Sequence, residues 1–435
     1  MKKQNNQNDI QKSRDNRTLI KRMAYTIWIL FIYHLLSYVS IPGVNIHEMS
    51  KLADNSSLTM LSMFSGGGFE TFSLMSMGVS AYITAQIIVQ LLQSDVVPTL
   101  TQWAKQGEVG RKKLNNLTRV FTLFFGFGQG IGITAGINQL TKSVFILNNS
   151  ALSYILIATL LTAGSFVAMW MGDQITERGL GNGVSVIITA GIIAKIPDTL
   201  MKTFKHFSPS STKNLMGAAG VALLVVLFSW LIVWVNDAEH RTPVQYERKS
   251  SLIGEQSFLP LKIVVPGVVP IIFASSLLSL PQIVMMLFRS HYKDTWYQVL
   301  GQFLTMNTIT GIFLYAILII AFTYAYSVVQ LDPDKMADNF EKQEAYPFVE
   351  PGKPTANYFK DLLYTLALPG SLFLVLISVI PLVITNFISP NLQLGLSGSS
   401  LLIIIGVFTD IGNQIRDLKT KSDYPGFLNK NYEFD

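Results

Sequence analysis

Stretches without a single charged residue recur along the chain and set its organisation. A helix that crosses the hydrocarbon core of a bilayer needs about 20 mostly apolar residues. The windows that lack Asp, Glu, Lys and Arg are 23–47, 71–94, 120–141, 143–172, 179–194, 214–236, 263–288, 295–331 and 362–409. The last window is long enough for two crossings, and Ser389-Pro390-Asn391, Gly395 and Gly398 break it near its middle. The pattern therefore predicts ten transmembrane helices.

The composition agrees with a membrane protein. Of the 435 residues, 49% are apolar and only 14% are charged, whereas a soluble domain carries about a quarter charged residues. The mean hydropathy is +0.38. These values argue against a soluble enzyme and against a disordered chain. The absence of cysteine excludes disulfides, cysteine nucleophiles and zinc–thiolate sites.

The basic residues predict the orientation of the chain. If the N-terminus lies in the cytoplasm, 25 of the 33 Lys and Arg residues fall on the cytoplasmic side. This bias predicts that both termini lie on the cytoplasmic side. The net charge of +6 is then mainly a topology signal and gives no nucleic-acid specificity. Residues 1–22 are polar and basic, so we expect a mobile or interfacial tail and no cleavable signal peptide.

The predicted spans offer little chemistry of their own. Asp410 lies near the end of the last span, and His34 is the only histidine within a span. A serine hydrolase centred on Ser397 would need a base at membrane depth, and His34 is the only candidate. Neither an HExxH helix nor a GxxxxGK[ST] loop is present. We therefore predict no enzyme, no metal and no cofactor, and a substrate would be driven by a partner protein.

Four connecting segments carry unusual sequences. Residues 61–72 contain three consecutive glycines, which fits either a re-entrant element inside the membrane or an ordinary external loop. Residues 173–183 hold three glycines within five positions and predict a tight turn between two spans. The long loops 236–262 and 331–360 predict docking of a cytosolic partner, and the first predicts a β-hairpin around Gly254.

These segments resemble the SecY family, the channel-forming subunit of the Sec protein translocon. The resemblance runs from about residue 20 to residue 430. Its motifs are Phe64-Ser65-Gly66-Gly67, Ile175-Thr176-Glu177-Arg178-Gly179-Leu180-Gly181-Asn182-Gly183, Arg241-Thr242-Pro243-Val244-Gln245-Tyr246, Ile272-Phe273-Ala274-Ser275-Ser276, Gly352-Lys353-Pro354-Thr355 and Ser400-Leu401-Leu402-Ile403. Both their order and their spacing agree with the family.

The resemblance implies an all-α integral membrane fold with ten helices in two inverted five-helix halves. The halves surround a central hourglass pore that holds a re-entrant plug. The boundaries expected here are a cytoplasmic tail at 1–22, a first half at 23–203, a second half at 214–416 and a second tail at 417–435. A lateral gate between the halves, beside spans two, three, seven and eight, would open toward lipid.

The resemblance also assigns roles to residues. The pore ring falls on Val79, Ile83, Ile188, Ile272 and Ile403. The plug covers about 62–72 and includes Ser62, Met63, Phe64, Ser65, Gly66, Gly67, Gly68, Phe69 and Glu70. Polar contacts across the lateral gate are expected from Gln86, Gln90, Ser275 and Ser276. Docking of the motor or ribosome is expected at Arg241, Tyr246, Arg248, Lys249, Glu350 and Lys353.

The implied partners are a SecA-type ATPase or a ribosome, a SecE-type and a SecG-type small membrane subunit, unfolded secretory polypeptides with signal sequences, and membrane lipids. Glu350 stands where the family usually carries an arginine that serves the motor. This charge reversal favours the accessory class of the family, which exports a few Ser-rich glycoproteins with its own motor, over the housekeeping channel. A secondary transporter of a small solute is the alternative outside the family.

Overall fold

The computed structural model is almost entirely helical and describes residues 2–45, 71–93, 97–141, 144–148, 150–206, 212–246, 257–288, 294–306, 308–342, 345–346, 350, 352–384 and 398–423. Within these residues the predicted spans correspond to ten helices: α1 (Lys2–Leu36), α4 (Ser80–Gln93), α6 (Glu108–Leu140), α7 (Ala151–Arg178), α8 (Gly183–His206), α9 (Thr212–Asn236), α10 (Val269–Leu287), α12 (Ile309–Leu331), α14 (Lys353–Val383) and α15 (Gly398–Asp423). Seven helical segments are long and apolar enough to cross a bilayer. The apolar parts of α8 and α9 are shorter, and α4 has 14 residues.

Proline and glycine set the start of α10, as the sequence predicts. Gly267 adopts a φ of +57°, a left-handed conformation that glycine tolerates without strain. Pro270 then occupies the first turn of the helix, where its missing N–H leaves no hydrogen bond unmade. The break expected within the long apolar window falls between α14 and α15, and residues 385–397 there lie outside the described part of the chain.

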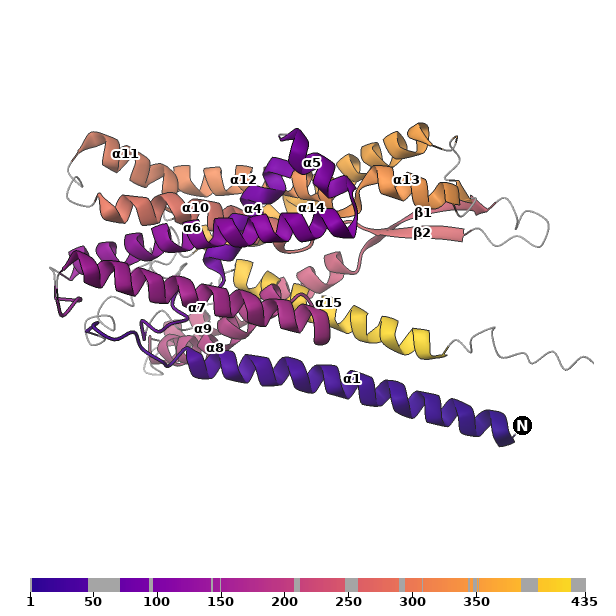
Figure 1. Cartoon of the computed structure of the whole chain (residues 1–435), viewed down its shortest axis with the longest axis horizontal. Helices are drawn as coiled ribbons and strands as arrows, with labels where there is room; N and C mark the ends of the chain where they lie inside the picture. Colours follow the sequence, from indigo (N-terminus) through magenta and orange to yellow (C-terminus); the bar gives the residue numbers. More distant parts are fainter. Residues whose placement is uncertain are drawn as a thin grey trace, which may run out of the picture.

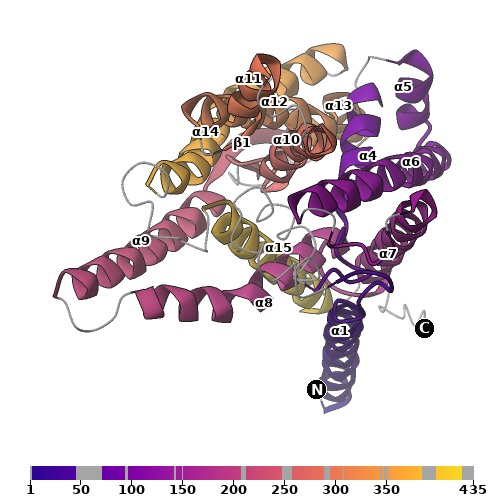
Figure 2. The same ribbon diagram turned by 90° about the vertical axis from the view of Figure 1, so that its left-hand side faces the viewer.

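The helices pack in two groups that follow the order of the chain. In the first group α6 packs against both α4 and α7, while α7 also contacts α1 and α8. In the second group α12 packs against α10 and α14, and α15 contacts α9 and α14. The groups meet where α10 lies against α4 and α6, and again where α15 lies against α1 and α8. Figure 2 shows α10 between α12 and α6 at the first of these meetings.

Both termini of the bundle and a small sheet gather at one end, which we call the tail end (Figure 1). The predicted hairpin is confirmed: β1 (Glu239–Tyr246) and β2 (Ser257–Lys262) pair antiparallel, with Thr242 opposite Leu259. A third strand, β3 (Ala345–Tyr346), pairs with the end of β1. Because β3 belongs to the second long loop, the sheet joins the two long loops to each other.

Several segments are more regular than the sequence suggests. Residues 2–22 were expected to form a mobile or interfacial tail, but they continue α1 as one helix. The second long loop contains the amphipathic helix α13 (Pro333–Lys342), which packs on α14. Short helices α5 (Pro98–Lys105) and α11 (Thr295–Leu304) connect spans at the two ends of the bundle. These short elements depend on contacts with neighbouring helices, which hydropathy windows do not detect.

Candidate functional site

Five aliphatic residues expected to form a ring are all buried in the same apolar cluster. Val79 immediately precedes α4, and Ile83 lies one turn later. Ile188 comes from α8, Ile272 from α10 and Ile403 from α15, so both helix groups contribute. Their exposed fractions run from 0% for Val79 to 6% for Ile403. The structure therefore brings together residues that are up to 324 positions apart in the sequence.

The environment of this cluster is uncharged. Among the side chains that the structure describes, the buried polar groups are all hydroxyls or amides, and they belong to Ser, Thr, Gln, Asn and the tyrosines Tyr33 and Tyr315. Branched aliphatic side chains give water no hydrogen-bonding partner, so a narrow passage lined by them expels water and blocks ions. The same surface makes no directional bond and can close around an apolar or polar chain of any sequence.

The segment expected to form a plug, including Ser62 to Glu70, lies outside the described residues. The structure describes the end of this segment, Thr71 and Phe72, and both residues make specific contacts. The Thr71 hydroxyl donates to the Ser37 carbonyl oxygen at 2.8 Å. Phe72 is fully buried, and its ring meets that of Phe145 edge to face at 4.8 Å between centroids. Phe72 therefore anchors the segment to the first helix group.

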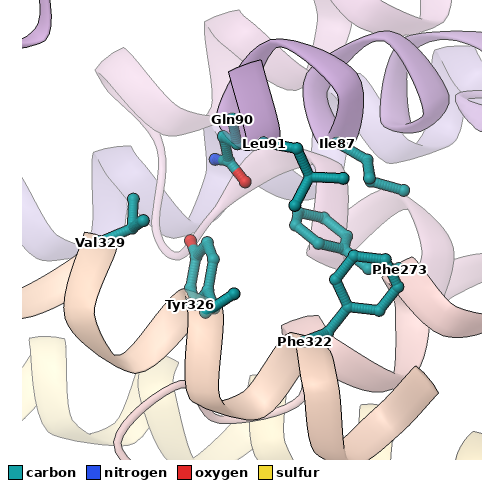
Figure 3. Close-up of a pocket in the computed structure, with 8 residues that line it drawn as sticks. Ile87, Gln90, Leu91, Phe273, Phe322, Tyr326 and Val329 are labelled. Atoms are coloured by element: carbon teal, nitrogen blue, oxygen red, sulfur yellow. The ribbon is translucent and has the colours of Figure 1, made fainter. Parts of the chain in front are cut away.

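A second site of interest lies on the seam between the groups, where α4, α10 and α12 converge (Figure 3). The Gln90 amide on α4 points toward the Tyr326 hydroxyl on α12. Phe273 on α10 packs edge to face against Phe322 and against Tyr326, with centroids 5.9 and 5.7 Å apart. A small pocket at this seam is lined by Ile87, Gln90, Leu91, Phe273, Phe322, Ala325, Tyr326 and Val329.

The other residues expected at this seam behave differently. Ser275 donates its hydroxyl to the Ile271 and Ile272 carbonyl oxygens of its own helix, at 2.8 and 3.0 Å. Ser276 is buried, and Gln86 is half-buried. Gln90 faces Tyr326 across the two groups, and the expected polar contacts of Gln86, Ser275 and Ser276 across the gate stay a prediction. Tyr326 was missed, although a tyrosine inside an apolar span signals a hydroxyl that needs a partner.

The glycine-rich turn between α7 and α8 is held by side chains of α15 and α1. Gly181 has a φ of +82°, and its N–H donates to Gln414 Oε1 of α15 at 2.8 Å. The neighbouring Leu180 N–H donates to Thr26 Oγ1 of α1 at 3.1 Å. Asn182 Oδ1 accepts from the Val184 N–H and begins α8. The predicted tight turn is therefore confirmed, and it joins the last helix to the first group.

The residues expected to dock a partner lie at the tail end as far as they are described. Arg241 and Tyr246 belong to β1, and Arg241 is exposed. Glu350 is exposed next to the start of α14, and its carbonyl oxygen accepts from the Thr355 hydroxyl at 2.7 Å. Lys353 is the exposed first residue of α14. Arg248 and Lys249 fall outside the described residues.

These features define a class of protein: a multi-pass helical membrane protein whose two helix groups share an aliphatic centre and meet along a seam. The chain belongs to the SecY family, because the family's model, described as SecY, matches residues 73–411.

Relatives and a solved structure support this assignment. Protein translocase subunit SecY 2 of Lactobacillus kefiranofaciens subsp. kefiranofaciens is 53% identical over 94% of this chain and all of its own length. SecY 1 of the same organism is 43% identical over 95% of this chain and 97% of its own length. A solved protein-conducting channel has the same fold, with a TM-score of 0.70 and 16% identity over 94% of this chain and 95% of that one.

Proposed function

We propose that this chain is the channel-forming subunit of a Sec-type protein translocase. It passes unfolded polypeptides across the bacterial plasma membrane, or sideways into it, through the ring of Val79, Ile83, Ile188, Ile272 and Ile403. The observation that carries this proposal is the convergence of these residues, from both helix groups, in one uncharged cluster of a SecY-family chain. An ion-coupled solute transporter usually places charged or readily ionised groups at membrane depth, and none of the described Asp, Glu, His, Lys or Arg side chains is buried.

The seam between α4, α6, α10 and α12 is the proposed lateral exit into lipid. Signal sequences and membrane anchors would part these helices and enter the bilayer between them. The Gln90 amide and the Tyr326 hydroxyl face each other across this seam. The plug would close the passage from the other end, with Phe72 as its fixed anchor.

The tail end is proposed to face the cytoplasm and to receive the partner that supplies energy. It carries both long loops, and β3 on β1 holds them together as one projecting platform. A SecA-type ATPase or a ribosome would dock there, because the chain itself offers no nucleotide-binding loop. A SecE-type subunit would hold the two helix groups together, and a SecG-type subunit would complete the assembly.

Crosslinking of a stalled polypeptide to the ring tests the proposed channel. The chain contains no cysteine, so single Ile188→Cys and Ile403→Cys variants give unambiguous crosslinks. In membranes that retain all partners, a secretory polypeptide stalled by a tightly folded C-terminal domain should form disulfides with both positions through its own engineered cysteine. Val226→Cys on α9 is the control, because Val226 is 68% exposed on the outside of the bundle.

Crosslinks to Ile188→Cys and Ile403→Cys, with none to Val226→Cys, would support passage through the ring. Equal crosslinking at all three positions, or none at the ring while the substrate is still exported, would contradict it.

We further propose that the chain serves the accessory branch of the family, with a small set of Ser-rich glycoproteins as substrates. Two observations support this choice: the 53% identity to a SecY 2 against 43% to a SecY 1 of one organism, and the acidic Glu350 at the docking end. A charge at a docking surface selects partners by attraction and repulsion.

Glu350→Arg should therefore change the motor that binds. We expect recovery of the accessory motor ATPase with the purified channel complex to fall by about tenfold, with a rise in the housekeeping motor, because one charge contact becomes repulsive. Quantitative mass spectrometry of the affinity-purified complex measures both motors. Glu341→Arg makes the same charge change on α13 and serves as the control. Equal recovery of both motors from Glu350→Arg and the unmodified chain would contradict the accessory assignment.

A further inference from the structure

Helix α6 carries two pairs of glycines that face different neighbours. Gly126 and Gly130 face α7 of the same helix group: a Cβ on Gly126 would lie 3.1 Å from the Thr162 side chain, and one on Gly130 would lie 3.1 Å from the Ala158 Cα. Gly132 and Gly136 face α10 of the opposite group. In each pair the glycines are four residues apart, so they lie on one face of the helix. Helix α6 is therefore wedged between its own group and the other one.

Gly132 and Gly136 lie so close to α10 that a residue with a Cβ would not fit at either position without moving its neighbours. A Cβ on Gly132 would lie 2.6 Å from the Ile283 Cγ2 atom, and one on Gly136 would lie 2.5 Å from the Met286 Cβ atom. Ordinary contacts of a Cβ begin at 3.4 Å. The Met286 Cβ is fixed to the backbone of α10, so a side chain at position 136 must move the helices apart by roughly 1 Å.

Ile283 is buried at this contact as part of the first group's apolar core. It is 4% exposed and belongs to the cluster that contains Ile133, Ile137 and Phe145. The packing is thus continuous across the seam, although α10 belongs to the second group. In a bilayer such helix contacts depend on van der Waals fit, because lipid tails are as apolar as the helices.

The contact of Gly132 and Gly136 with Ile283 and Met286 can part without exposing polar side chains to lipid, unlike the part of the seam that holds Gln90 and Tyr326. Its glycine, isoleucine and methionine surfaces are all compatible with acyl chains or with an apolar segment of a substrate. At the exposed end of both helices, Gln139 Nε2 donates to the Leu287 carbonyl oxygen at 3.4 Å. The free energy of closure here depends mainly on shape.

We propose that the fit of Ile283 and Met286 against Gly132 and Gly136 sets how apolar a substrate segment must be to open the lateral exit. This inference rests on the proposed function. A substrate segment competes with the glycine face for the surface of α10, so a tight fit demands a strongly apolar segment. Larger residues at 132 or 136 hold the helices apart and lower that demand. Gly132 and Gly136 are therefore specificity-determining residues that act through helix spacing.

The spacing is measured directly with a cysteine pair at the end of the seam. Gln139→Cys and Leu287→Cys are placed in the otherwise cysteine-free full-length chain, within cells that contain all partners. Oxidation should crosslink the pair rapidly when Gly132 and Gly136 are present. Gly136→Ala should slow the crosslinking by about tenfold, the factor expected for overpacking a close contact. In the chain without the cysteine pair, Gly136→Ala should raise export of a reporter with a shortened apolar signal segment by a similar factor.

Two other glycines of α6 provide matched controls. Nothing lies within 4 Å of a Cβ on Gly128, so Gly128→Ala should change neither crosslinking nor export. Gly130→Ala strains the contact with α7 inside one group, so it should lower the amount of protein without changing the crosslinked fraction. Gly132→Ala should act like Gly136→Ala, and adding Ile283→Ala should restore crosslinking, because it removes the Cγ2 atom that the new Cβ would meet.

The inference is overturned if Gly132→Ala and Gly136→Ala accumulate normally and crosslink and export as the unmodified chain does. It is also overturned if Gly128→Ala has the same effect, or if Ile283→Ala fails to restore crosslinking to Gly132→Ala. If a single glycine variant folds poorly, the double variant Gly132→Ala with Ile283→Ala still tests the inference. Failure of the proposed function looks different: a reporter with a strong signal segment would then not crosslink to Ile188→Cys in the unmodified seam.

Discussion

Replacing both Ile188 and Ile403 by asparagine should make the resting channel leak ions. The two side chains are buried on α8 and α15, at 1% and 6% exposure, within the same apolar cluster. Asparagine offers hydrogen bonds to water at the place where the aliphatic ring offers none, so a wet passage becomes less costly. If each amide lowers the free energy of wetting by about 0.7 kcal/mol or more, conductance rises by at least about tenfold. Conductance of the reconstituted complex across a planar bilayer measures this.

The same double substitution should let weaker signal sequences through, since a hydrated ring no longer holds the closed state as firmly. Ile188→Val with Ile403→Val is the control: it keeps two branched aliphatic side chains and should keep the seal. If the asparagine variant folds, assembles and neither leaks nor gains tolerance for weak signals, the two residues do not form the seal. A leak of equal size in the valine control would point to general loosening of the core instead.

The helical spans could be predicted from the sequence because the bilayer imposes a simple rule. Backbone groups in hydrocarbon must be satisfied within the segment, so charge-free windows of sufficient length become helices. The ten helices follow from this rule, including α9, which ends at Asn236 and is followed by strand β1 instead of another span. Even the start of α10 was visible, because Pro266 and Pro270 leave few alternatives.

The connecting elements could not be predicted with the same ease. β3 contains only two residues, Ala345 and Tyr346, and pairs with a strand that is about a hundred positions away. No local pattern encodes such a pairing. Helix α13 is polar and short, and a helix of 10 residues needs tertiary contacts, which α14 provides. The first turns of α1, from Lys2 onward, are too polar to belong to a predicted span, so the hydropathy pattern does not predict that the helix begins there.

The candidate site was predictable only in part. Hydropathy places Ile188 and Ile403 in spans. It cannot distinguish a residue of the ring from another buried residue such as Ile187, because both are aliphatic residues in an apolar stretch. Their assignment came from the resemblance to a family. The contact between Gln90 and Tyr326 and the fit of Gly136 against Met286 depend on which helices become neighbours. A glycine pair in a membrane helix signals close packing, but the partner emerges only from the fold.

Gly183→Ala should remove the folded protein almost completely from the membrane. Gly183 begins α8, where this helix leaves the tight turn and crosses α7. A Cβ there would lie 1.9 Å from the carbonyl oxygen of Gly172 and 2.9 Å from the Gly172 Cα. Both are backbone atoms, and Gly183 N–H is already held by the Thr176 hydroxyl at 2.9 Å. Relief requires the two helices to separate, which costs about 3 kcal/mol or more.

A loss of this size exceeds what a marginally stable protein tolerates, so membrane-bound protein should fall to roughly a tenth of its normal amount or less. Quantitative immunoblotting of membranes, followed by size-exclusion chromatography in detergent, measures it. Gly412→Ala is the matched control, since nothing lies within 4 Å of a Cβ at that helical position. Because Gly183 belongs to the turn that Gln414 and Thr26 hold, a normal amount of folded Gly183→Ala protein would mean that α7 and α8 do not cross as closely as described. The position that α8 gives to Ile188 would then differ as well.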